Sequence, residues 1–202
     1  MYRFNKTLSS PLFACWDITY RCNLLCRHCC FDVRTASKDN ELTSAEGMSF
    51  LDELASAKVI SMQFAGGEPL IRQDFLSLAA HSCKLGIQTS IATNGVLVDA
   101  SLAKELKRIG IKMVQVSIDG HSAEQHDYIR GSGMFEKAIT GIENLKSAGI
   151  RVTIASVLYK RNRVTFPQII QLAATLGVKS VRCQLLLPQA NGQRNLQDLY
   201  VA

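Results

Sequence analysis

Three cysteines stand close together in segment 22–29, which reads CNLLCRHC. Cys26 follows Cys22 by four residues and Cys29 follows Cys26 by three, so a short loop can wrap one small inorganic group. Thiolates are the usual protein ligands of iron–sulfur clusters, and a cubane cluster has four irons to hold. Because the segment offers three thiols and no obvious fourth, the spacing predicts a cluster with one iron free for a non-protein ligand.

Other uses of cysteine fit this sequence less well. A zinc site usually has two separated pairs of ligands, and here no second pair is visible. A disulfide framework belongs to an oxidising compartment, and the start of the chain lacks the apolar core of a secretory signal. Cys30 adjoins Cys29, and we expect one compact cluster to use only one of these neighbours. The remaining thiols lie in apolar strand or helix patterns and are expected to be buried: Cys15, Cys83 and Cys183.

Three later segments carry short motifs of small and polar residues: GGEP at 66–69, TNG at 93–95 and SIDG at 117–120. The stretch 16–24, WDITYRCNL, leads into the cysteines, and His28 stands just before the third thiol. These motifs, in this order, resemble those of the radical S-adenosylmethionine (radical SAM) enzymes, whose signature is CxxxCxxC. The resemblance covers residues 10–190, nearly the whole chain.

The resemblance implies two cofactors and one type of chemistry. A 4Fe–4S cluster would be held by Cys22, Cys26 and Cys29, and S-adenosylmethionine (SAM) would chelate the free iron through its amine and carboxylate. An electron from the reduced cluster then breaks a carbon–sulfur bond, and the resulting 5′-deoxyadenosyl radical abstracts hydrogen from a substrate. The protein mainly binds, orients and shields, so no catalytic residue is assigned beyond the cluster ligands.

The same resemblance implies contacts to SAM. Gly66 and Gly67 have no Cβ, so their backbone can approach the ligand closely. Glu68 can accept a hydrogen bond from the ammonium of SAM. The other expected contacts are Thr93 and Ser117 to the ribose or carboxylate, Asp119 to the ribose, Arg130 to the carboxylate, and His28 and Leu187 to the adenine. The alternatives are local backbone capping by the two hydroxyls and an ordinary surface arginine.

Strand and helix patterns alternate along the chain, which predicts βα units on a parallel sheet. Strands are expected at 12–19, 59–65, 88–93, 113–118, 152–158 and 181–187, with helices between them and the segment 119–134 as a loop. Six units are too few to close an eight-stranded barrel, and the resemblance implies an open, partial (βα)6 TIM-like barrel. Parallel sheets bind ligands at the carboxyl ends of their strands, and the four motifs each follow one of the first four strands.

Composition and charge limit the function classes. The chain has 202 residues, 47% hydrophobic and 20% charged, which suits one globular domain, taken here as 1–202. No apolar run is long enough to span a bilayer and no secretory signal is present, which predicts a cytoplasmic protein without a membrane partner. The net charge is +6, but the densest basic cluster is KRNR at 160–163. We expect that cluster to be a solvated loop and expect no nucleic-acid binding, with contact to an anionic substrate as the weaker alternative.

Segments 116–121, 131–135 and 145–150 resemble the SPASM-type peptide maturases, such as the pyrroloquinoline quinone peptide cyclase and the anaerobic sulfatase maturases. Haem-modifying relatives share the pattern. The implied partners are a peptide or small-molecule substrate and a reducing donor of flavodoxin or ferredoxin type. Such enzymes usually carry auxiliary clusters in a C-terminal extension, and no cysteine follows Cys183, so that domain is expected to be absent. An iron–sulfur electron carrier and an inactive partner of a maturase remain the non-enzymatic alternatives.

Overall fold

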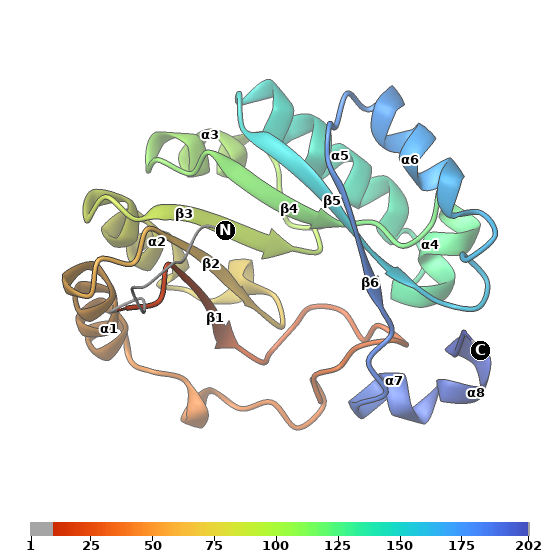
Figure 1. The fold of residues 1–202 in the computed structure, drawn as a ribbon, viewed down its shortest axis with the longest axis horizontal. Helices are drawn as coiled ribbons and strands as arrows, with labels where there is room; N and C mark the ends of the chain where they lie inside the picture. The colour runs from red at the N-terminus through yellow and green to blue at the C-terminus, as the bar shows by residue number, and fades with distance from the viewer. Residues whose placement is uncertain (1–9, 202) are drawn as a thin grey trace, which may run out of the picture.

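A computed structural model describes residues 10–201 and contains a six-stranded parallel sheet (Figure 1). Each strand pairs with the next strand in the sequence, so the spatial order is the chain order. The outer strands do not pair with each other within the described residues, and the sheet is therefore open, as predicted. The strands are β1 (Phe13–Thr19), β2 (Ser61–Gly66), β3 (Gln88–Thr93), β4 (Met113–Ser117), β5 (Arg151–Leu158) and β6 (Val181–Leu185).

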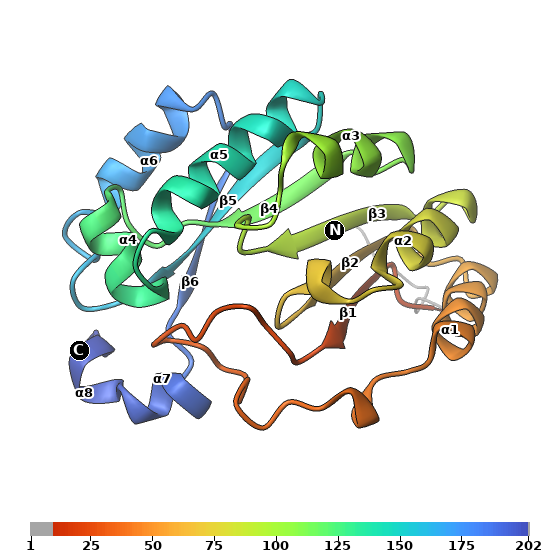
Figure 2. The ribbon, with the colours of Figure 1, turned by 180° about the vertical axis from the view of Figure 1, so that it is seen from behind.

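Helices cover one face of this sheet, and Figure 2 shows them in front of the strands. Side chains alternate between the two faces of a strand. Phe64 of β2, Val114 of β4 and Ile154 of β5 therefore point to the helices and are fully buried there. The helices on this side are α1 (Ser44–Ser56), α2 (Phe75–Lys84), α3 (Ala100–Arg108), α4 (Ala123–Arg130), α5 (Met134–Ser147) and α6 (Phe166–Thr175). Two short helices, α7 (Ala190–Arg194) and α8 (Leu196–Leu199), follow β6 and lie beside the cysteine loop.

The structure corrects two expectations about local structure. Helix α4 occupies half of the segment 119–134. This segment was expected to be a loop, because the helix sequence AEQHDYIR has few apolar residues to signal a helix. Cys15 and Cys183 were expected to be buried but are exposed, and Cys83 is only half-buried. Cys15 and Cys183 lie on the two edge strands, where apolar sequence does not guarantee a covering layer.

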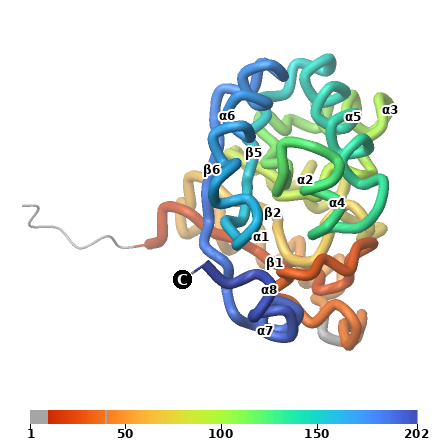
Figure 3. Tube along the Cα trace, turned by 90° about the vertical axis from the view of Figure 1, so that its right-hand side faces the viewer, coloured from red at the N-terminus to blue at the C-terminus, as the bar shows by residue number. Residues whose placement is uncertain are grey.

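The cysteine segment lies in a long loop between β1 and α1 that crosses below the carboxyl ends of the strands (Figures 1 and 3). Helix α7 fixes the far side of this loop. The Gly192 amide donates to the carbonyl of Cys29 at 3.1 Å, and the Asn191 side chain donates to the carbonyl of Cys26 at 3.2 Å. The loop is therefore attached to the chain at both edges of the sheet.

Arg72 joins the same loop to the sheet from the other side. Its guanidinium donates to the carbonyls of Ile18 and Leu42, at 2.8 and 2.7 Å. It also pairs with Asp74, which precedes α2, with an Nε–Oδ1 distance of 2.6 Å. Asp74 in turn accepts from the hydroxyl of Ser44, at the start of α1. One ion pair thus connects the ends of two helices and one strand.

Within residues 10–201, no helix combines the length and apolar character needed to cross a bilayer.

We expect Asp74→Asn to destabilise the fold near neutral pH but not in acid. The hydrogen bond from Arg72 lowers the pKa of Asp74 to about 2. A carboxylate with a lowered pKa stabilises the fold above its unfolded pKa of about 4, and the contribution is lost as pH falls through about 2. The expected loss of unfolding free energy is about 1–2 kcal/mol at pH 7, approaching zero near pH 2.

Urea unfolding of wild type and variant at both pH values measures this difference. Glu105→Gln is the matched control, because Glu105 pairs with Arg108 within one exposed helical turn. Solvent-exposed pairs of this kind contribute little to the free energy of unfolding. Equal losses in the two variants at pH 7 would contradict the part assigned to Asp74.

Candidate functional site

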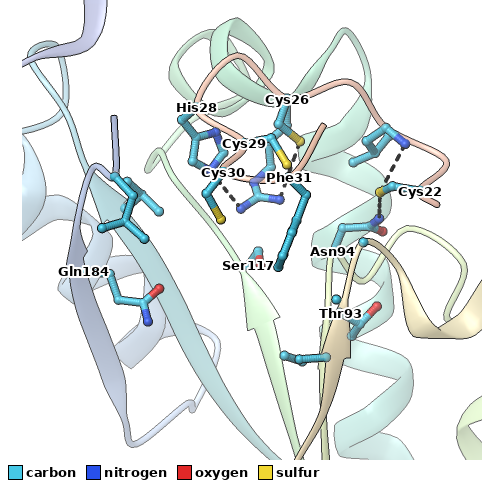
Figure 4. A pocket seen from close by; sticks show the side chains of 18 of the residues that line it. Cys22, Cys26, His28, Cys29, Cys30, Phe31, Thr93, Asn94, Ser117 and Gln184 are labelled. Carbon is cyan, nitrogen blue, oxygen red and sulfur yellow. Dashed lines mark hydrogen bonds between the residues drawn. The ribbon is translucent and has the colours of Figure 1, made fainter. Parts of the chain in front are cut away.

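A cavity of about 570 Å³ opens at the carboxyl edge of the sheet, between the cysteine loop and the strand ends (Figure 4). It brings together most of the predicted site residues, although they come from six separate segments. Two predicted residues, Glu68 and Asp119, do not line it. The predicted residues that do line it are Cys22, Cys26, His28, Cys29, Gly66, Gly67, Thr93, Ser117, Arg130 and Leu187.

The thiols of the cysteine loop are free and face this cavity. Burial raises the pKa of both Cys22 and Cys26 to about 11, so both are protonated thiols at neutral pH. Metal binding must displace those protons, since the thiolate is the ligand form. Over residues 10–201, no three His, Cys, Asp or Glu side chains are grouped so as to hold a single metal ion.

A buried ion pair lies against the thiols. Arg130 Nε donates to Asp119 Oδ2 at 2.5 Å, and the other carboxylate oxygen accepts from the Val157 amide at 2.7 Å. The remaining nitrogens of the guanidinium lie 3.9 Å from Cys26 Sγ and 3.4 Å from His28 Nε2. Burial alone would raise the pKa of Asp119, but the Arg130 charge holds it below its usual value. Asp119 therefore lies behind Arg130, and only Arg130 reaches the cavity wall.

Glu68 also lies behind the wall rather than on it. Its fully buried carboxylate accepts from the Leu70 amide, the Thr93 hydroxyl and the Asn94 amide, at 3.1, 2.8 and 2.8 Å. Burial is the main cause that raises its pKa, to about 6, and these donors oppose the rise. Glu68 thus joins the end of β2 to the turn after β3. Asn94 belongs to the TNG motif but was given no expected role. It lines the cavity from this turn, and its side-chain amide lies 3.9 Å from Cys22 Sγ.

The two glycines at the end of β2 are required by close packing against the cysteine loop. A Cβ on Gly67 would lie 2.1 Å from the carbonyl oxygen of Arg21, and one on Gly66 would lie 2.2 Å from that of Thr19. The backbone amides use this proximity, since Gly67 donates to Thr19 and Glu68 donates to Arg21. Both glycines also line the cavity. Because they have no side chain, the backbone of the cysteine loop can pack directly against the end of β2 at the cavity wall.

The match to known families agrees with this arrangement. Residues 16–173 match the family model described as the Radical SAM superfamily. The chain belongs to the radical SAM superfamily. The CxxxCxxC segment lies in the loop after β1, on the same edge of the sheet as the three other motifs.

Several curated relatives are similar over most of the chain. A Fe-coproporphyrin III synthase of Methanosarcina barkeri is 39% identical over 158 residues, which are 78% of this chain and 39% of the relative. An AdoMet-dependent heme synthase of the same species is 34% identical, over 93% of this chain and 54% of the relative. A mycofactocin maturase of Mycobacterium tuberculosis is 32% identical, over 98% and 50%. The chain thus spans about half the length, or less, of these relatives. Both the maturase branch and the haem branch are represented among them.

Solved radical SAM structures share the fold. SuiB of Streptococcus suis, bound to its precursor peptide SuiA, superimposes with a TM-score of 0.79 at 19% identity, covering 89% of this chain and 40% of that chain. A structure described as native anSMEcpe with bound AdoMet has a TM-score of 0.74 at 23% identity, covering 87% and 51%. These likenesses confirm the predicted open α/β barrel.

A histidine lies behind the cavity wall. His126 is on α4 and is fully buried. Its Nδ1 accepts from the Asp119 amide at 3.2 Å, and burial lowers its pKa to about 4, so the ring is neutral. The signal in the sequence for this position is the spacing of His126, Ile129 and Arg130, which places them on one side of a helix.

Proposed function

We propose that this chain forms the cluster-binding and SAM-binding core of a radical SAM enzyme, with residues 1–202 as one domain. The observation that carries the proposal is the single cavity shared by the three free thiols Cys22, Cys26 and Cys29, a buried arginine and the ends of strands β2 to β6. When bound, a 4Fe–4S cluster and SAM would supply a carbon-centred radical able to take hydrogen from a substrate. The chain itself holds, orients and shields the reacting groups.

The residues present fit a thiolate-bound cluster. Cys22, Cys26 and Cys29 face one cavity and carry no disulfide. Deprotonation of these thiols places negative charge in a buried setting, and the Arg130 guanidinium beside Cys26 is positioned to offset it. Three thiolates leave one iron of a cubane cluster without a protein ligand. We propose that this iron receives SAM.

The cavity wall offers complementary chemistry for the rest of SAM. The Arg130 fork suits a carboxylate, and Thr93 and Ser117 can contact the ribose or carboxylate. His28 is buried, and its Nδ1 has no hydrogen-bond partner among the described residues, which favours a contact with the adenine. Leu187 lines the same cavity. Glu68 and Asp119 are proposed to act through their neighbours, with Glu68 fixing the Thr93–Asn94 turn and Asp119 fixing Arg130.

We propose a peptide or a small cofactor precursor as the substrate, and a cytoplasmic enzyme. The names of the relatives include a mycofactocin maturase and heme synthases, which supports both substrate classes. In Figure 1 the helices α1 to α6 lie on the far face of the sheet, and the cavity opens at the carboxyl edge of the sheet. The electron would come from an external reducing protein of flavodoxin or ferredoxin type.

Anaerobic reconstitution with iron and sulfide, followed by dithionite and SAM, tests the core of this proposal. The expected result is a 4Fe–4S absorbance and release of 5′-deoxyadenosine, quantified by chromatography. An iron–sulfur electron carrier would show the cluster without 5′-deoxyadenosine. An inactive partner of a maturase would release none either, so 5′-deoxyadenosine at the level of a no-protein control would overturn the proposal.

A further inference from the structure

A basic patch of four side chains lies beside the cysteine loop: Arg27 from the loop, and Lys160, Arg161 and Arg163 from the segment between β5 and α6. The ring of Tyr128 joins the two parts. Its centre lies 4.3 Å from the guanidinium carbon of Arg27 and 3.6 Å from that of Arg161. Because Arg27 directly follows Cys26, their Cα atoms are about 3.8 Å apart. The patch therefore begins one residue from an expected cluster ligand.

The segment that carries three of these cations is held by buried contacts. Asn162 is fully buried, and its side chain accepts from the Tyr159 amide at 2.8 Å and donates to the carbonyls of Asp119 and Val157 at 3.0 and 2.9 Å. The Lys160 amide donates to the carbonyl of Leu199, in α8. A surface fixed in this way loses little conformational entropy when a partner binds.

The patch also has the chemistry of a protein interface. Lys160 and Arg163 line a cleft of about 440 Å³ together with Tyr200, which is 57% exposed. Val164, in the same segment, is 73% exposed. Within the described residues, Asp198 is the carboxylate that pairs with the patch, through Arg27 at 2.7 Å. Exposed aromatic and apolar side chains bordered by arginines are typical of binding surfaces.

We infer that the basic patch is the docking surface for an acidic protein that carries single electrons. The inference rests on the proposed function, since a chain that holds a reducible cluster needs an external electron. In the step itself, the carrier is oxidised by one electron and the cluster is reduced by one, and no atom is transferred. Opposite charges accelerate the encounter of the two proteins, and the position beside Cys26 brings the carrier close to the cluster.

Reduced flavodoxin is the probe, mixed anaerobically with the cluster-loaded chain. The test variant is Lys160→Glu/Arg163→Glu, because both side chains line the open cleft, while Arg27 and Arg161 pack on Tyr128 and stay unchanged. The control is Lys104→Glu/Lys137→Glu, which makes the same charge change at exposed positions of α3 and α5.

The measured quantities are the Kd of the complex and the rate of flavin oxidation. At about 50 mM salt, we expect the test variant to raise the Kd and lower the rate of flavin oxidation by about tenfold each. The control should stay within about twofold of wild type for both quantities. The difference should shrink near 1 M salt, where the Debye screening length falls to about 3 Å. Equal effects in the two variants, or none in the test variant, would overturn the docking surface. Binding of polyglutamate, an acidic peptide, gives a further test. If the test variant transfers electrons like wild type but no longer binds polyglutamate, the docking surface is contradicted and the patch is a site for acidic substrates.

Dithionite separates this inference from the proposed function, because a small reductant needs no docking surface. SAM cleavage driven by dithionite should be equal in wild type and both variants. Absence of that cleavage in all three proteins would contradict the proposed function. Loss of flavodoxin-driven reduction in the test variant alone, with dithionite-driven cleavage intact, is the result expected of a docking surface.

Discussion

Replacing Cys22, Cys26 or Cys29 with alanine should remove the 4Fe–4S cluster from reconstituted protein and abolish release of 5′-deoxyadenosine. The three thiols face the same cavity. Cys30 also lines it, but Cys30 directly follows Cys29, so we do not expect it to replace a missing ligand in the CxxxCxxC spacing. Iron content, visible absorbance and 5′-deoxyadenosine together measure the effect. We expect 5′-deoxyadenosine to fall to the level of a control without protein.

Cys30→Ala is the sharpest control for these variants. Cys30 adjoins Cys29, lines the same cavity and, in Figure 4, extends its sulfur from the same loop. The variant should keep its cluster and its SAM cleavage. Cys183→Ala tests an exposed thiol far along the chain and should also behave as wild type. Loss of the cluster in Cys30→Ala, or its retention in Cys26→Ala, would contradict the assignment of the three ligands.

The alternation of strands and helices could be predicted because β2 to β5 each present an apolar row to the helices. The residues Met62, Phe64, Ile91 and Val116 show this pattern directly. The edge at which the site lies could be predicted as well, since every motif follows a strand. The exposure of Cys15 and Cys183 could not, because sequence does not show which strands end at the edge of a sheet.

The contacts that Glu68 and Asp119 make behind the cavity wall could not be predicted from the sequence, for another reason. Glu68 and Asp119 were expected to touch SAM, and those contacts stay predictions. The sequence did not show that Glu68 also accepts a hydrogen bond from Thr93, 25 residues away. Asp119 pairs with Arg130 across the start of α4. Both carboxylates lie at strand ends, where a ligand contact and a contact with the next segment require the same type of residue. Only the distances between atoms separate the two possibilities.

Asp119→Asn should weaken SAM binding through Arg130. The substitution keeps the size of the side chain and can keep the acceptor for Val157, but it removes the charge that pairs with the buried guanidinium. Breaking one side of a buried ion pair costs about 3–5 kcal/mol of stability. With Arg130 no longer fixed against Cys26 and His28, we expect SAM affinity to fall about tenfold or more, while the cluster is retained. Equilibrium binding of SAM to cluster-loaded protein measures the change.

A double-mutant cycle with Arg130→Met distinguishes a positioning carboxylate from one that touches the ribose. If Asp119 acts only through Arg130, the double variant should bind SAM about as weakly as Arg130→Met alone. A direct contact to the ribose would instead make the two losses add. Ser117→Ala is the comparison for an expected direct contact, since Ser117 lies on the cavity wall at the end of β4. Its loss should add to that of Arg130→Met. Additive losses for Asp119 and Arg130 would contradict positioning through Arg130 alone. The second effect of Asp119 would then be a direct contact to SAM or an action through His28, whose Nε2 lies 3.3 Å from Asp119 Oδ2.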